Sequence, residues 1–292
     1  MKAWIIYAKA DAVKNEGYIS FYVDEGKKRG ITFEVIFVEK LQFGVKDGEW
    51  YLTYDGEMVK MPDFVVCRTI YPKLSLQLEL MKIPVFNNSI IARLCNDKAL
   101  TYQSVAKLKI PMIDTTFCKG NEIDSILATD TYEAPVVIKS VEGHGGSLVY
   151  LFDRASDDRE READCIRKGL NGSDFVVQPL TGKRHQDLRV YVIGTQVIAA
   201  VLRTAKQGFK SNFSLGGEVR LYELKEHELT VVNRIIECFD FGLVGIDFLI
   251  GDDGELIFNE IEDVVGARML YQCSDINLVG RYLDYIITRI NF

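Results

Sequence analysis

The sequence has few of the residues on which several enzyme classes depend. It contains three histidines among 292 residues, and none is spaced as a metal-binding pair, so a zinc hydrolase is not indicated. Its six cysteines are scattered and form no CxxC pair, which argues against a zinc ribbon and against a disulfide framework. We therefore expect reduced, mostly buried thiols and a cytoplasmic protein.

Long apolar runs and an excess of positive charge are also missing. No apolar stretch approaches the roughly 20 residues of a membrane helix. Met1 is followed by a strand-like run, so we expect no signal peptide. The formal net charge of −7 disfavours nucleic acid as a partner, because its phosphates attract basic surfaces. Hydrophobic residues make up 48% and charged residues 26%, which is typical of a globular protein of this length with two or three lobes.

The order of apolar segments predicts a mixed α/β fold. A β-α-β opening indicates a parallel sheet, and two polar breaks with a D-G dipeptide each indicate a small hairpin insertion. The elements expected up to residue 88 are strands at 2–8, 31–38, 63–70 and 84–86 and helices at 17–29 and 74–81. A helix capped by Ser89 is expected to run to about Lys109, and after Pro111 the strands come in pairs.

Three acidic residues near the end of the sequence form the strongest candidate site. Asp247 lies in one strand of a predicted hairpin, and Glu260 and Glu262 lie two residues apart in its partner strand. Alternation places both glutamates on one face, and pairing across the turn brings Asp247 close to them. Carboxylates among apolar neighbours suit a hard cation such as Mg²⁺ beside phosphates. A solvated polar face is the alternative.

A lysine before a glycine-rich turn is the second candidate. Lys139 ends a buried strand and is followed by Glu142-Gly143-His144-Gly145-Gly146. The lysine could meet a nucleotide phosphate while glycine amides hold another, although the turn is not a Walker loop because GK[ST] is absent. A tight hairpin with a solvent-facing lysine is the alternative.

Two arginines in another predicted hairpin are the third candidate. Arg189 and Arg203 lie in its two strands, which are separated by Gly194-Thr195. Unpaired guanidinium groups are costly to bury, so these two would suit a carboxylate or an acyl phosphate. Surface salt bridges between the strands are the alternative.

These stretches, in this order, resemble the ATP-grasp superfamily and, within it, the RimK-type carboxylate–amine ligases of amino acids and peptides. The resemblance covers about residues 87–290 and is densest at Asn96-Asp97-Lys98, in the block from Asp187 to Gly217, and at Asp247 with Asn259-Glu260-Ile261-Glu262. It implies an α/β (α+β) ATP-grasp fold. The implied parts are a pre-ATP-grasp α/β domain at 1–88 and an ATP-grasp domain at 89–292, with a small central lobe at about 111–180 and an antiparallel-sheet lobe at about 181–292.

The resemblance also implies roles for single residues. Those expected to bind ATP are Lys98 and Lys139 at the phosphates, Gln178, Pro179 and Leu180 at adenine, Asp187 at the ribose, and Lys210, Ser211 and Asn212 near the phosphates and the metal. Those expected to hold Mg²⁺, or Mn²⁺, are Asp247, Glu260 and Glu262. Arg203, with Arg189, is expected to steady the acyl phosphate and the tetrahedral intermediate.

Two departures from the family pattern limit what the resemblance implies. The hinge reads Gln178-Pro179-Leu180 where the family has Gln-Glu, and because proline has no amide hydrogen, Leu180 would have to donate to adenine. Glu262 stands where the family has an asparagine ligand, and the loop after it differs from the family pattern. The resemblance therefore does not identify the substrate of this protein. Candidate substrate contacts are Arg68, Tyr71 and Arg268, of which Arg268 could equally pair with Asp263.

The resemblance implies an ATP- and Mg²⁺-dependent ligase that activates a carboxylate as an acyl phosphate and joins it to the amine of an amino acid or peptide. No side-chain nucleophile is needed, and the segment 205–217, with three glycines, is a candidate lid. One alternative is an ATP-grasp kinase acting on a hydroxyl, and another is a non-catalytic ATP-binding regulatory protein. The oligomeric state is open, with self-association as one possibility.

Overall fold

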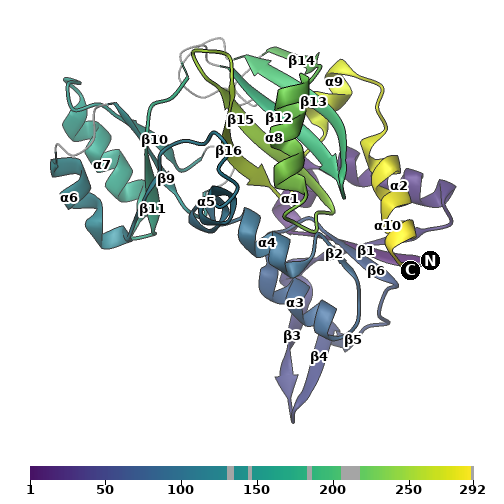
Figure 1. Ribbon diagram of the computed structural model, residues 1–292. Coiled ribbons are helices and arrows are strands. Elements are labelled where there is room, and N and C mark those ends of the chain that lie inside the picture. Colours follow the sequence, from purple (N-terminus) through teal and green to yellow (C-terminus); the bar gives the residue numbers. More distant parts are fainter. Residues whose placement is uncertain (130–134, 144–146, 183–185, 205–217, 291–292) are drawn as a thin grey trace.

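The computed structural model describes residues 1–129, 135–143, 147–182, 186–204 and 218–290. Within these ranges the strands form four sheets that are accompanied by helices, so the predicted mixed α/β class is confirmed. Figure 1 shows three parts: an N-terminal part with a projecting hairpin, a small central part, and a C-terminal part built on the largest sheet.

The N-terminal sheet is parallel and has the strand order β2-β1-β6-β7. Five of the six residues of its central strand β1 are buried, as expected for a parallel strand that is covered on both faces. Tyr22 of α2 packs on one side, and Leu74 and Leu78 of α3 pack on the other. The strands are β1 (Lys2–Tyr7), β2 (Thr32–Phe37), β6 (Phe64–Cys67) and β7 (Val85–Phe86), and the helices are α1 (Lys9–Lys14), α2 (Glu16–Lys28) and α3 (Pro72–Leu80).

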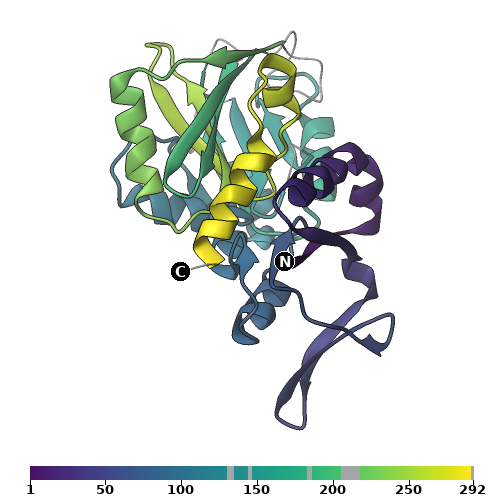
Figure 2. The same cartoon turned by 90° about the vertical axis from the view of Figure 1, so that its right-hand side faces the viewer.

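A separate antiparallel sheet projects from this part, as Figures 1 and 2 show. Its strands are β3 (Leu41–Lys46), β4 (Glu49–Tyr54) and β5 (Glu57–Met58), and a short 3₁₀ turn, η1 (Val38–Lys40), precedes them. Both tight turns use an aspartate and a glycine with positive φ: 51° and 83° at Asp47-Gly48, 52° and 85° at Asp55-Gly56. Two-residue hairpin turns require this backbone conformation, so the D-G dipeptides predicted the insertion correctly.

The helix expected from Ser89 to Lys109 is two helices, α4 (Ser89–Cys95) and α5 (Lys98–Ala106). Asn88, rather than Ser89, caps α4 by accepting a hydrogen bond from the Ile91 amide, and Asp97 caps α5 by accepting one from the Leu100 amide. The break arises because an aspartate cap starts a new helix at this point. It also places Lys98 in the first turn of α5.

The central part is an antiparallel sheet with the order β10-β9-β11-β8. Apolar side chains of α6 and α7, such as Leu127 and Ile166, pack against its strands. The elements are β8 (Thr116–Cys118), η2 (Gly120–Glu122), α6 (Ile123–Ala128), β9 (Val136–Ser140), β10 (Val149–Phe152), α7 (Arg159–Leu170) and β11 (Phe175–Pro179).

The C-terminal sheet is antiparallel and has the order β14-β13-β12-β15-β16. Val232 and Ile235 of α8 cover one face, whereas Leu283 and Ile286 of α10 belong to the core on the other face, which also includes β1. The elements are β12 (Gln186–Ile193), β13 (Gln196–Thr204), β14 (Glu218–Tyr222), α8 (Glu226–Ile236), β15 (Leu243–Ile250), β16 (Leu256–Glu262), α9 (Arg268–Cys273) and α10 (Leu278–Ile290). The sequence analysis missed β14, α6 and α9, which are short and only weakly periodic.

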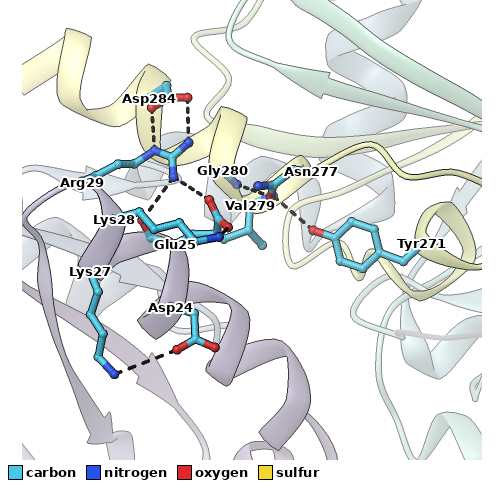
Figure 3. Close-up of polar contacts among 10 residues, drawn as sticks. All are labelled: Asp24, Glu25, Lys27, Lys28, Arg29, Tyr271, Asn277, Val279, Gly280 and Asp284. Carbon is cyan, nitrogen blue, oxygen red and sulfur yellow. Dashed lines mark hydrogen bonds and ion pairs between the residues drawn. The ribbon is translucent and has the colours of Figure 1, made fainter.

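Ion pairs join the N-terminal part to the last helix, as Figure 3 shows. Arg29 donates through Nε and a terminal nitrogen to both carboxylate oxygens of Asp284 in α10, at 2.6 and 3.0 Å, and also to Glu25 of α2. Hydrogen bonding from Lys28 is the main cause that lowers the pKa of Glu25, to about 2. The two ends of the sequence are thereby held together on one side of the molecule.

Among the described residues, no helix is both long enough and apolar enough to cross a membrane.

Candidate active site

The register of the C-terminal sheet places the predicted acidic and basic residues side by side. Arg189 of β12 lies opposite Asp247 of β15, and Asp247 lies opposite Glu260 of β16. On the other side of β12, Asp187 lies opposite Arg203 of β13. Directly opposed residues have Cβ atoms about 5 Å apart, so this pairing alone brings the side chains into contact range.

Asp247 is the centre of a buried ion network. Its two carboxylate oxygens accept hydrogen bonds from Nε and a terminal nitrogen of Arg189, both at 2.7 Å, and one of them also accepts from Arg203 at 2.8 Å. Arg203 bonds Asp187 through Nε, and Arg189 also forms an ion pair with Glu262. Arg189 and Arg203 are therefore not surface salt-bridge partners, because both lie in the interior.

The network contains three carboxylates and two guanidinium groups, which leaves it with one excess negative charge. Burial would raise the pKa of Asp247, but the charges of Arg189 and Arg203 outweigh it and hold that pKa at about 2. For Asp187 and Glu262, burial dominates and the pKa is raised. The charged form of Asp247 is thus the most strongly favoured of the three.

The side chains of Glu260 and Glu262 reach solvent at the edge of this network, with 37% and 33% of their surface exposed, whereas that of Asp247 is 1% exposed. Both glutamates are partly exposed, although Oε2 of Glu262 is buried against Arg189. Their carboxylate oxygens fit Mg²⁺, which prefers oxygen ligands and keeps several waters. Both oxygens of Asp247 are used by guanidinium groups. As arranged, no group of three histidine, cysteine, aspartate or glutamate side chains within the described ranges is placed to hold a metal ion, so the three-carboxylate site stays a prediction.

Two lysines lie next to the acidic cluster and come from different parts of the chain. Lys98 of α5 is buried; its Nζ donates to the Gly143 carbonyl and lies 3.7 Å from Glu260. Lys139 of β9 donates to the side chain of Asn259, at 2.9 Å. Burial lowers the pKa of Lys139 to about 8, against the opposing charge of Glu260. Lys139 is partly exposed, and its Nζ is bound to Asn259 rather than free as in the alternative reading of its hairpin.

In the predicted adenine-binding hinge, one atom, the amide nitrogen of Leu180, has a different partner from the expected one. Gln178 is buried and donates to Thr115, at 2.8 Å, while its carboxamide oxygen has no hydrogen-bond partner among the residues that the structure describes. The Leu180 amide, expected to donate to adenine, donates instead to the Pro135 carbonyl at 3.1 Å. Pro179 precedes it without an amide hydrogen, so this amide can serve adenine only after leaving Pro135. Asp187, expected at the ribose, is buried against Arg203.

The predicted phosphate contacts Lys210, Ser211 and Asn212, the turn residue His144 and the candidate lid at 205–217 lie outside the described residues.

Two of the three candidate substrate residues, Arg68 and Arg268, lie near the same tyrosine, Tyr18. Arg68 follows β6 and is buried; Tyr71 is half exposed, caps α3 and packs edge-on against Phe43. Arg268 donates to the Lys14 carbonyl, at 3.2 Å, and lines a cavity of about 380 Å³ with Tyr18. Asp263, the alternative partner of Arg268, instead accepts hydrogen bonds from Asn87 and Asn96.

Sequence reasoning missed a buried polar network behind the acidic cluster. Asp263 follows Glu262 directly and accepts hydrogen bonds from Asn87 at 2.6 Å and from Asn96 at 3.2 Å. Asn87 also donates to the Leu243 carbonyl and accepts from the Gly242 amide. These partners are up to 176 residues apart, so no local spacing could have revealed them.

Comparisons with known proteins agree with this arrangement. The RimK-like ATP-grasp domain family matches residues 95–286. A probable alpha-L-glutamate ligase of Enterobacter sp. (strain 638) is 26% identical over 271 residues, which cover 90% of this chain and 89% of the relative. Human beta-citrylglutamate synthase B is 26% identical over 87% of this chain and 68% of its own length, and an uncharacterized protein of Mycoplasma genitalium is 27% identical over 99% and 93%.

Solved structures show the same fold. The RimK domain ATP-grasp protein of Sphaerobacter thermophilus superposes with a TM-score of 0.72 over 98% of this chain and 99% of that one, at 18% identity. D-cycloserine synthetase superposes with a TM-score of 0.71 over 99% and 100%, at 17% identity. The family match covers well over half of the sequence, and the resemblance inferred from the motifs is confirmed: this chain belongs to the RimK-like ATP-grasp family.

Proposed function

We propose that this protein is an ATP- and Mg²⁺-dependent ligase that forms an amide bond between a carboxylate and an amine through an acyl phosphate, acting on an amino acid or a peptide. The observation that carries the proposal is the meeting of Lys98 and Lys139 with Glu260 at the edge of the C-terminal sheet. Phosphate-binding cations and metal-binding carboxylates are needed together at a site of phosphoryl transfer. The names of two relatives, a probable alpha-L-glutamate ligase and a beta-citrylglutamate synthase, support the same reaction class.

The lysines have the properties that phosphate binding requires. Lys98 is held by the Gly143 carbonyl in front of Glu260. Lys139 is held in place by Asn259. Fixed cations in a poorly solvated site stabilise the charge that develops on a transferred phosphoryl group, because they need little reorganisation during the reaction.

Glu260 and Glu262 are the residues that would hold Mg²⁺, which when bound neutralises charge between phosphate groups. Asp247 fits the metal only if a guanidinium group leaves it. In the structure it instead fixes Arg189 and Arg203, and these are the donors proposed to face a developing acyl phosphate.

The chemistry needs no nucleophilic side chain. The substrate carboxylate attacks the γ-phosphate of ATP and releases ADP; the amine then attacks the acyl carbon, loses a proton and displaces phosphate. The protein contributes orientation and exclusion of water, because water would hydrolyse the acyl phosphate.

Hydroxylamine tests the acyl phosphate directly. The protein is incubated with ATP, Mg²⁺, pooled carboxylic acids and hydroxylamine, and hydroxamate and ADP are measured together. We expect equal amounts of both, and neither with Glu260→Gln. ADP accompanied by a phosphorylated hydroxyl compound and no hydroxamate would contradict the proposal and favour a kinase.

A further inference from the structure

Arg68 is a buried cation without a carboxylate partner in the described part of the chain. Its side chain is 7% exposed. Within the described residues, its Nε donates a hydrogen bond to the Tyr7 hydroxyl, at 3.3 Å, and its guanidinium carbon lies 5.1 Å from the centroid of the Tyr18 ring. A guanidinium group has five N–H donors in a fixed fork, so one neutral hydroxyl leaves most of its capacity unused.

The nearby carboxylate of Asp263 is not hydrogen-bonded to Arg68. Burial raises the pKa of Asp263, and among the opposing influences is the positive charge of Arg68, which shows that the two groups are neighbours. However, the oxygens of Asp263 accept hydrogen bonds from Asn87 and Asn96. Arg68 is thus close to the loop after Glu262 and is not bound to it.

The position of Arg68 in the fold is one where ligands bind. Arg68 follows β6 directly, and Tyr7 is the last residue of the neighbouring parallel strand β1. Ligands of parallel α/β sheets bind beyond the carboxyl ends of the strands. The N-terminal sheet therefore presents Arg68 at its binding edge, next to the residues that follow the acidic cluster.

We propose that Arg68 is a receptor for a non-reacting carboxylate of the substrate. A buried guanidinium group that has no hydrogen-bonded carboxylate is costly, and its fork matches a carboxylate in two parallel hydrogen bonds. The N-terminal part thereby selects substrates that carry an anionic group besides the reacting ones. The assignment rests on the ligase function above for its meaning, but the binding itself requires neither ATP nor turnover.

Binding of glutarate to the full-length protein, measured by calorimetry with the uncharged glutaramide as the matched compound, tests the assignment. We expect glutarate to bind and glutaramide to bind at least tenfold more weakly. Arg68→Met should weaken the binding of glutarate at least tenfold. Arg68→Lys keeps the positive charge but loses the two parallel guanidinium donors, so it should weaken this binding less. Arg268→Met removes the other candidate arginine and should leave the affinity within twofold.

The unfolding temperature of the ligand-free protein shows whether Arg68 also stabilises the fold, apart from any role in binding. Arg68→Met should leave it unchanged or raise it, because the variant removes an unpaired buried charge. Unchanged glutarate binding in Arg68→Met, or a loss with Arg268→Met alone, would overturn the assignment. So would equal affinity of the wild type for glutarate and glutaramide. If glutarate binding depends on Arg68 while no hydroxamate forms, the receptor stands and the proposed ligase reaction fails.

Discussion

At the scale of single residues, Asp247 shows how one side chain can support several others. It lies in the interior and accepts three hydrogen bonds from two arginines. Its removal would leave both cations without their shared partner. Such a loss is far more costly than the loss of an exposed pair.

Replacement of Asp247 by asparagine should therefore destabilise the fold strongly. We expect Asp247→Asn to lower the free energy of unfolding by about 3–5 kcal/mol, measured by urea denaturation without Mg²⁺. Asp240→Asn is the control, because Asp240 pairs with Arg289 where both side chains are more than half exposed. The control should change by at most about 1 kcal/mol. Equal effects in the two variants would show that the buried network does not stabilise the fold.

Lys139 gives nucleotide binding a pH dependence. Its pKa of about 8 in the free protein means that it loses its proton as the pH rises from 7 to 9. If only the charged form binds phosphate, the affinity for ATP should fall by up to about tenfold over this range. Lys139→Arg keeps its charge throughout and should remove most of the dependence. Calorimetric titration with ATP at both pH values measures this; an equally steep loss in Lys139→Arg would refute the assignment.

Residue identities predicted part of this site and could not predict the rest. Alternation and hairpin pairing placed Asp247 opposite Glu260 correctly, since both follow from a period of two and a turn. The sequence analysis left the environment of the arginines open, because burial depends on which strands become neighbours. The Leu180 amide was expected to be available, but whether Pro135 takes it depends on pairing between distant strands.

At the scale of elements, the contact between α2 and α10 joins residues far apart in the sequence. Arg29, which follows α2, Glu25 of α2 and Asp284 of α10 form a chain of ion pairs, and the side chain of Glu25 is 9% exposed. The apolar pattern predicted the helix at 17–29, and its pairing with α10 became known only from the structure. The break in the helix predicted at 89–109 is different, because Asp97, which suits a cap better than a helix interior, is a local signal for it that the prediction did not use.

Glu25 makes this contact sensitive to acid. Its pKa is lowered in the folded protein to about 2, whereas an unperturbed glutamate titrates near 4.5. The stabilisation is therefore complete above pH 4.5 and is lost as the pH falls through the folded value near 2. We expect Glu25→Gln to lower the unfolding temperature at pH 7 and to flatten its decline between pH 4.5 and 2.

The neighbouring pair in Figure 3 supplies the control for this prediction. Asp24 and Lys27 lie on the same helix, 4.0 Å apart, with 68% and 72% of their side chains exposed. Asp24→Asn should leave the unfolding temperature and its acid profile almost unchanged. An acid profile of Glu25→Gln that follows the wild type would show that this contact does not contribute to stability.

At the scale of the whole molecule, the candidate site lies where three parts meet. The central part supplies Lys139, the helix before it supplies Lys98, and the C-terminal sheet supplies the acidic cluster. The N-terminal sheet approaches the same region through Arg68 and Asn87. The ATP-grasp fold was predicted from motifs that belong to the nucleotide side of the site. The substrate side has no such motif, which is why it had to be inferred from burial and charge.

The condensed product is the most direct test of the ligase function. The purified protein is incubated with ATP, Mg²⁺ and pools of amino acids and peptides, and ADP and new masses are measured together. The ligase account predicts one ADP for each new compound, whose mass equals that of an acid plus an amine minus one water, and no product with Glu260→Gln. ADP formed with a phosphorylated compound and no such condensed mass would contradict it.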